Sequence, residues 1–167
     1  MIFLVNHSNL NQARAHREIH DFLASRVDKP DSPVLGVKYH PSMSDREEVR
    51  AEIDVPRFVG DTSYDTERAE LQVGFEMGPS LDFDHYRIGW VESERELMVG
   101  WHQDETHPEL GRCHFQMEYE GDCLQRTEAE YRDDHPLNIL GKRLDALPEI
   151  LRSLSDGVSE VSESLVQ

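Results

Sequence analysis

Apolar and polar residues alternate with a period of two along the middle of the chain, and this limits the possible folds more than any other feature. Between residues 48 and 55, for example, Val49, Ala51 and Ile53 share one side and charged residues occupy the other. The same alternation marks seven short segments: Val34–Tyr39, 48–55, Glu70–Met77, 85–90, Glu96–Trp101, Cys113–Tyr119 and Leu124–Tyr131. Period two is typical of half-buried strands. With short polar turns between the segments, it predicts an antiparallel meander of about five to seven strands with one buried face.

Two segments outside this region have helical spacing. Ser8 or Asn9 can cap a helix whose apolar residues are Leu10, Ala13, Ile19, Phe22, Leu23 and Val27. A second helix is expected after 133–136, with Pro148 as a kink and with a leucine stripe at Leu140, Leu144, Leu147, Leu151 and Leu154. The stripe fits either the sheet of its own domain or a partner protein.

The predicted fold class is therefore α+β, a mostly antiparallel β-meander sheet with an N-terminal helix and a C-terminal helix packed on it. We expect residues 1–154 to form a single domain, because neither a repeat nor a composition break divides them. Residues 155–167 are small, polar and acidic, which predicts a flexible tail.

The charge of the chain restricts its partners. Among 167 residues, 34 Asp and Glu oppose 17 Lys and Arg, giving a net charge of −17, and only Lys29, Lys38 and Lys142 are lysines. A surface this acidic excludes broad binding to nucleic-acid backbones, which depends on Lys and Arg. An acidic, lysine-poor composition favours the cytosol of a halophile, where salt screens the repulsion, over that of an acidic mesophile.

Cysteines and hydropathy indicate a cytoplasmic location. Cys113 and Cys123 are too few for a disulfide framework. No apolar run is long enough to cross a membrane, and Met1–Val5 is short and lacks the charged leader of a signal peptide. We expect no membrane partner, and the oligomeric state stays open.

The segment Trp101–Gln116, WHQDETHPELGRCHFQ, concentrates polar chemistry between two predicted strands. Where the odd-numbered residues of the strand ending at Trp101 face the core, His102 faces away, and the same alternation applies to the neighbouring strands. One open face should therefore carry His85, Arg87, His102, His114 and Gln116, with Asp104 and His107 over its rim.

Such a face suits phosphodiester cleavage without a cofactor. His102 and His114 could act as general acid and base, because histidine titrates near neutral pH. Arg87 would stabilise charge on phosphate oxygens, with Asp104 or His107 as orienting groups. His85 and Gln116 would position the substrate.

Two other interpretations of this face remain open. His102, Asp104, His107 and His114 could ligate zinc or iron, although their spacing matches no common metal motif. Alternatively, the histidines are merely solvated. The same choice applies to His16 and His20, whose four-residue spacing we interpret as a solvated helix face.

The segment HYRIGW…ELMVGWHQDETHPELGRCHFQ, about residues 84–120, resembles the core of the TumE-like toxin–antitoxin family. The matching features are Tyr86 with Arg87, Trp101 followed by Asp104, the His107–Pro108 pair, and His114. The resemblance implies a toxin that acts on RNA as a ribonuclease and is held by an antitoxin protein. The alternative is a non-catalytic interaction module that docks a partner through its leucine stripe or acidic surface.

Overall fold

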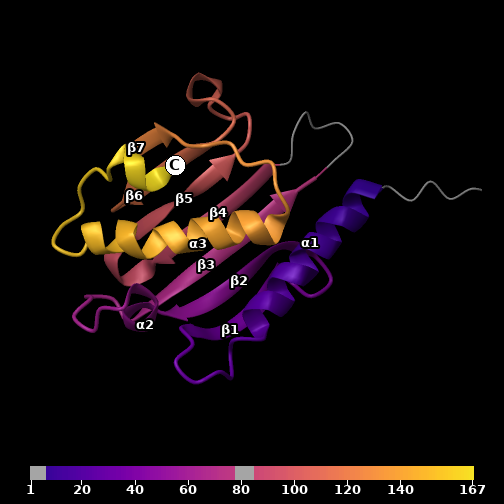
Figure 1. Ribbon diagram of the computed structural model, residues 1–167, viewed down its shortest axis with the longest axis horizontal. Coiled ribbons are helices and arrows are strands. Elements are labelled where there is room, and N and C mark those ends of the chain that lie inside the picture. Colours follow the sequence, from indigo (N-terminus) through magenta and orange to yellow (C-terminus); the bar gives the residue numbers. More distant parts are fainter. Residues whose placement is uncertain (1–6, 78–84) are drawn as a thin grey trace, which may run out of the picture.

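A seven-stranded antiparallel sheet dominates the computed structural model, which describes residues 7–77 and 85–167, with side chains described from Gln12 onward. Within these residues each strand pairs with the next one in sequence, so the spatial order is simply β1 to β7 (Figure 1). The strands are β1 (Val34–Pro41), β2 (Arg46–Asp54), β3 (Arg68–Glu76), β4 (His85–Glu92), β5 (Leu97–Gln103), β6 (His114–Tyr119) and β7 (Asp122–Glu128). The predicted meander is confirmed.

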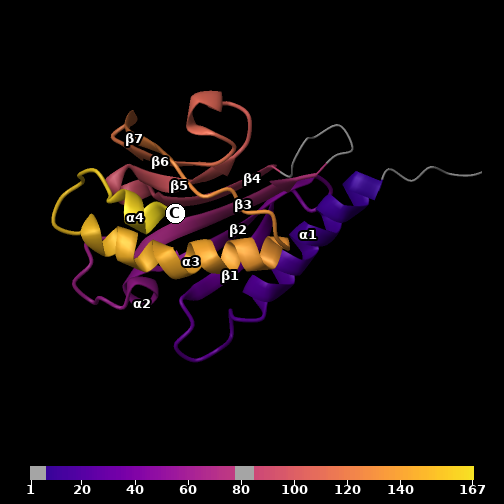
Figure 2. The same cartoon turned by 45° about the horizontal axis from the view of Figure 1, so that its top comes forward.

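The two long helices cover the same face of this sheet (Figures 1 and 2). They are α1 (His7–Ala24) and α3 (Pro136–Ser153); α2 (Val55–Val59) and α4 (Glu163–Val166) are short. The core lies between helices and sheet, where Ile19 and Leu23 of α1 and Leu140 of α3 join the inward residues of the strands. The other side of the sheet, called the open face below, carries no α-helix of the described residues (Figure 2). The predicted α+β class is confirmed.

The helix α2 was not expected from the sequence. Pro56 lies in the first turn of this helix, at a position where its missing N–H costs nothing. The Asp54 side chain accepts a hydrogen bond from Arg57 N at 3.0 Å, and Gly60, at φ 73°, ends the helix.

The leucine stripe of α3 is part of the core. Leu140, Leu147, Leu151 and Leu154 are all buried against the sheet and its neighbouring helices. The prediction that the stripe docks a partner is therefore wrong, and the prediction that it covers its own domain is confirmed. Pro148 lies inside α3, which continues from Pro136 to Ser153 and does not restart at the proline.

Residues 155–167 return to the sheet, which corrects the prediction of a flexible tail. Val161 and Val166 are buried. Trp101 Nε1 donates a hydrogen bond to Val166 O at 2.8 Å. Gln125 donates to Val161 O at 2.9 Å and accepts from Val161 N at 2.7 Å. The segment is held because buried polar groups of the sheet find their partners in its backbone.

The prediction that His16 lies on a solvated helix face is wrong. His16 is 0% exposed, and its Nδ1 lies 2.9 Å from Arg46 O while its Nε2 accepts a hydrogen bond from Phe75 N at 3.0 Å. Both ring nitrogens are thus used, in the neutral form with a proton on Nδ1. His20 is half-buried and stacks on Tyr39, with 4.4 Å between the ring centroids. Neither histidine is placed as a metal ligand.

The apolar opening Met1–Val5, named in the sequence analysis, lies outside the described residues. Across the described ranges, no helix has the length and hydropathy needed to span a membrane. Both Cys113 and Cys123 are free thiols.

Candidate functional site

One row of directly opposed residues crosses the open face. It runs through Gly74 of β3, Arg87 of β4, His102 of β5, His114 of β6 and Glu128 of β7. Residues that are paired in register in adjacent strands point to the same side of a sheet. The register therefore places Arg87, His102 and His114 side by side, as the alternation in the sequence predicts.

Three imidazoles meet at this row, and we call His102, His107 and His114 the histidine cluster. The ring centroids of His102 and His114 are 5.2 Å apart, and those of His107 and His114 are 5.0 Å apart. His107 comes from the β5–β6 connection, just before the short 3-10 turn η2 (Pro108–Leu110). Figure 2 shows this connection curling over β5 and β6 on the side away from the helices.

Because of that connection, His114 is not solvated as the open face had suggested. It is 1% exposed, and its Nε2 has no hydrogen-bond partner among the described residues. A buried ring nitrogen without a hydrogen-bond partner lowers the free energy of unfolding, so the position of His114 costs the fold some stability. His102 and His107 remain partly exposed on either side of it.

Burial and nearby positive charge keep His102 and His114 neutral. Burial lowers the pKa of His102 to about 4, and the Arg87 guanidinium adds to the effect. Burial also lowers the pKa of His114, against the opposing influence of the Asp104 carboxylate. Both rings are therefore uncharged at neutral pH and able to accept a proton.

Asp104 lies at the end of β5 and is fixed by its own loop. Its Oδ1 accepts hydrogen bonds from Thr106 N at 2.9 Å and from Thr106 Oγ1. Burial alone would raise the pKa of Asp104, but these bonds and the neighbouring His114 and His102 hold it below its usual value. Asp104 therefore remains a carboxylate beside the neutral rings of His102 and His114.

Arg87 forms no ion pair with a described residue. Among the described residues no carboxylate lies within ion-pair distance of it, and its guanidinium contacts only Met98 Sδ, at 3.7 Å. An exposed guanidinium left unpaired suits a phosphate, which it can bind through two parallel hydrogen bonds.

Gln116 and His85 flank the row without joining the cluster. Gln116 lies two residues along β6 from His114, donates to Glu118 and accepts from Arg126 Nε at 3.0 Å. His85 is the first residue of β4 and lines a cavity together with Asp104. Of the predicted site residues, the structure thus brings together Arg87, the histidine cluster and Asp104.

Two residues near the site were not singled out from the sequence. Glu109 Oε1 lies 3.2 Å from His107 Nδ1, where it can stabilise a protonated ring. Arg126 projects from β7 in the row next to the cluster, and like Arg87 it forms no ion pair within the described part of the chain. The alternation at Gln125–Arg126 and the two-residue spacing from His107 to Glu109 were the available signals.

The metal interpretation gains no support from the side-chain geometry. Within residues 7–77 and 85–167, no three His, Cys, Asp or Glu side chains are arranged to hold one ion. Cys113 is buried in the core, where burial raises the pKa of its thiol.

Comparison of the chain with protein-family models, with curated proteins and with solved structures finds no match.

Proposed function

We propose that this chain is the toxin-like member of a toxin–antitoxin pair and that it cleaves RNA without a metal ion, through the histidine cluster and Arg87. One observation carries the proposal: a neutral imidazole, His102, lies directly opposite an arginine that has no carboxylate partner in the described structure. A proton acceptor beside an anion-binding group is what cleavage of a phosphodiester requires.

The reaction assigns separate roles to the two exposed imidazoles. His102 takes the proton of a ribose 2′-hydroxyl, the 2′-oxygen attacks phosphorus, and the P–O5′ bond breaks. His107, whose positive form is stabilised by Glu109, gives its proton to the departing 5′-oxygen. Arg87 neutralises the phosphate oxygens. The products are a 2′,3′-cyclic phosphate and a 5′-hydroxyl, so protons and electrons balance.

His114 serves as a positioning residue in this scheme. At 1% exposure it does not reach a substrate, but its ring contacts both of the imidazoles that would. Asp104 opposes the loss of basicity that burial imposes on His114. The pairing of His102 with His107, instead of His102 with His114, follows from this difference in exposure.

High salt would allow an acidic chain to bind an anionic substrate, because it screens the repulsion between them. With a net charge of −17, the protein repels RNA at low ionic strength. At about 1 M salt, charges farther apart than roughly 3 Å are screened. A bound phosphate would then sense mainly Arg87 and its immediate neighbours. The proposal therefore includes a salt-rich cytoplasm as the working environment.

The antitoxin is the partner that the family resemblance implies. With the leucine stripe buried in the core, an antitoxin would have to bind another surface, and the open face is the one whose coverage would also block the cluster.

Induced expression in a host grown at high salt tests the proposal. We expect growth arrest with the wild-type chain and normal growth with the His102→Gln/His107→Gln double variant. The matched control is His40→Gln, which changes a half-buried histidine at the far edge of the same sheet, on β1.

The possible outcomes distinguish the assignment of the chain as a toxin from the assignment of its catalytic residues. Arrest that survives in a folded double variant would show that the site is wrong. Normal growth with abundant, folded wild-type protein would contradict the toxin assignment and favour the non-catalytic module.

A further inference from the structure

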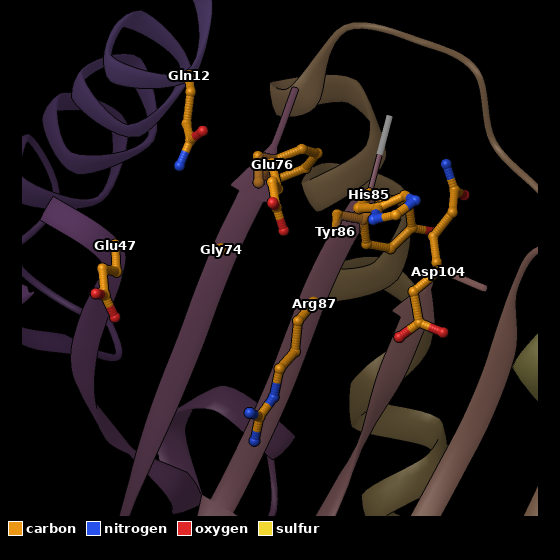
Figure 3. Close-up of a pocket in the computed structure, with 10 residues that line it drawn as sticks. Gln12, Glu47, Gly74, Glu76, His85, Tyr86, Arg87 and Asp104 are labelled. Carbon is orange, nitrogen blue, oxygen red and sulfur yellow. The ribbon is translucent and has the colours of Figure 1, made fainter. Parts of the chain in front are cut away.

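A cavity of about 440 Å³ adjoins the row that carries the histidine cluster. Gly74 forms part of its wall, and the polar residues along it are Gln12, Glu47, Glu76, His85, Tyr86, Arg87, Gln103 and Asp104. In Figure 3 Gln12 and Glu47 lie on one side of the strand that carries Gly74, and Arg87 and Asp104 on the other. Its volume falls within the roughly 300–1,000 Å³ of small-molecule sites.

The cavity exists because β2 and β3 separate at this end. Their last paired residues are Val49 and Val73, whereas β3 stays paired with β4 as far as Glu76. From the helix side His16 fills the gap by bonding to both separated strands. The cavity occupies the part of this gap that His16 does not fill.

Gly74 keeps this space empty without being needed by the fold. A Cβ at Gly74 would lie 3.6 Å from Glu47 O and from Glu48 Cβ, which is ordinary contact. The backbone there also has no left-handed φ that would demand glycine. A larger side chain could therefore be accommodated by the strand and would project into the cavity.

Arg87 and Asp104 connect the cavity to the proposed reaction site. Arg87 lines the cavity and also stands opposite His102 in the row. A phosphate held by Arg87 would therefore place the attached nucleoside at the cavity mouth.

Three of the polar side chains along the cavity, those of Glu47, Glu76 and Asp104, are carboxylates. The side chains of Glu47 and Glu76 form no hydrogen bond or ion pair with another described residue, and Asp104 keeps one oxygen outside its bonds to Thr106. Carboxylates accept hydrogen bonds but cannot donate them. A ligand fitting this lining must present N–H groups, and one that presents carbonyl oxygens would be repelled.

We propose that this cavity binds the nucleobase next to the cleaved phosphate and selects bases that carry an amino group, guanine above the others. Guanine presents two adjacent donors, N1–H and the 2-amino group, which match the two oxygens of one carboxylate. Uracil presents a single N–H between two carbonyls and fits worst. This inference rests on the proposed function for the identity of its ligand class.

Equilibrium titration with the four 3′-mononucleotides and with inorganic phosphate, in high KCl, tests the inference without cleavage. We expect 3′-GMP to bind most tightly and 3′-UMP about tenfold or more weakly, since hydrogen bonds to a charged group contribute strongly. Inorganic phosphate should bind no better than 3′-UMP.

Variants locate the binding. Gly74→Leu should abolish the preference for 3′-GMP, whereas Gly36→Leu on β1, where nothing lies within 4 Å of an added Cβ, should leave it intact. Glu76→Gln should reduce the preference severalfold. If Gly74→Leu fails to fold, Gly74→Ala and Glu76→Gln carry the test.

The outcomes also separate the inference from the function. Selective binding of 3′-GMP without RNA cleavage would support the cavity and contradict the ribonuclease. Cleavage with equal binding of all four nucleotides would overturn the inference alone. Failure of the folded protein to bind any nucleotide, or selectivity that persists in Gly74→Leu, would overturn it as well.

Discussion

The imidazole of His114 lies directly opposite that of His102 in the pairing of β5 with β6, with 5.2 Å between the ring centroids. One ring is sealed from solvent and the other borders an unpaired arginine. The partly exposed ring is that of His102, and burial and Arg87 together keep it neutral.

The pH dependence of cleavage follows from that neutrality. The profile of kcat/KM reports the pKa of the free enzyme's base, and for His102 this is about 4. We expect cleavage to keep its full rate at pH 6, where an ordinary histidine is mostly protonated. Arg87→Ala should move the acid limb to higher pH and lower the rate about 10²-fold. Lys38→Ala, which removes equal charge from the same face, should do neither. An unmoved acid limb in Arg87→Ala would contradict the account.

The stability of the fold should depend on the neutrality of His16. Burial lowers the pKa of His16 in the folded chain, against the hydrogen bond of its Nδ1 to Arg46 O, which the charged form can also make. Its contribution is therefore complete above the unfolded value of about 6.5 and is lost as pH falls below that. We expect His16→Leu to cost about 1–3 kcal/mol at pH 8, because Phe75 N and Arg46 O lose their partner. In urea titrations the difference from wild type should shrink at pH 5.5; a constant difference would contradict this.

Two paired glycines of the open face should respond oppositely to alanine. A Cβ on Gly100 would lie 2.4 Å from Ile88 O and 2.9 Å from Gly89 Cα, both of them backbone atoms. A Cβ on Gly89 would have nothing nearer than 4.0 Å. We expect Gly100→Ala to cost about 1–3 kcal/mol or more and Gly89→Ala to change stability by less than about 1 kcal/mol. Thermal unfolding of the two variants decides, and equal melting temperatures would refute the close approach of β4 and β5.

The last turn of the chain should contribute to global stability. Val166 is 0% exposed, and its carbonyl accepts from Trp101 and Arg143. We expect Val166→Ala to cost about 1–3 kcal/mol in denaturant unfolding. Ser159→Ala, at an exposed position of the same segment, should be neutral. Identical midpoints for Val166→Ala and wild type would restore the flexible tail that the sequence suggested.

The strands and the shared face were predictable because both follow from local alternation. Arg87, His102 and His114 each lie next in sequence to an aromatic or apolar residue that faces the core. Because successive side chains of a strand point to opposite faces, the sequence alone predicted that these three face away from the core. The leucine stripe was equally visible, since its spacing depends on helical periodicity alone.

Other features depend on contacts between distant residues and left no local signal. Val161 and Val166 are isolated valines in a polar segment, and their partners Gln125 and Trp101 lie 36 and 65 residues away. From the sequence His16 looks like a surface histidine, because the separation of β2 and β3 around its ring leaves no local signal. The burial of His114 depends on how the β5–β6 connection folds, which alternation does not determine.

The ends of cleaved RNA test the central claim most directly. Purified protein would be incubated in high KCl and a metal chelator with a single-stranded RNA that contains all four bases, beside His102→Gln and His40→Gln. The account predicts 2′,3′-cyclic phosphate and 5′-hydroxyl ends from wild type and His40→Gln, and a loss of about 10²-fold or more in His102→Gln. Ends with 3′-hydroxyl and 5′-phosphate groups, cleavage that stops in chelator, or undiminished cleavage by His102→Gln would contradict it.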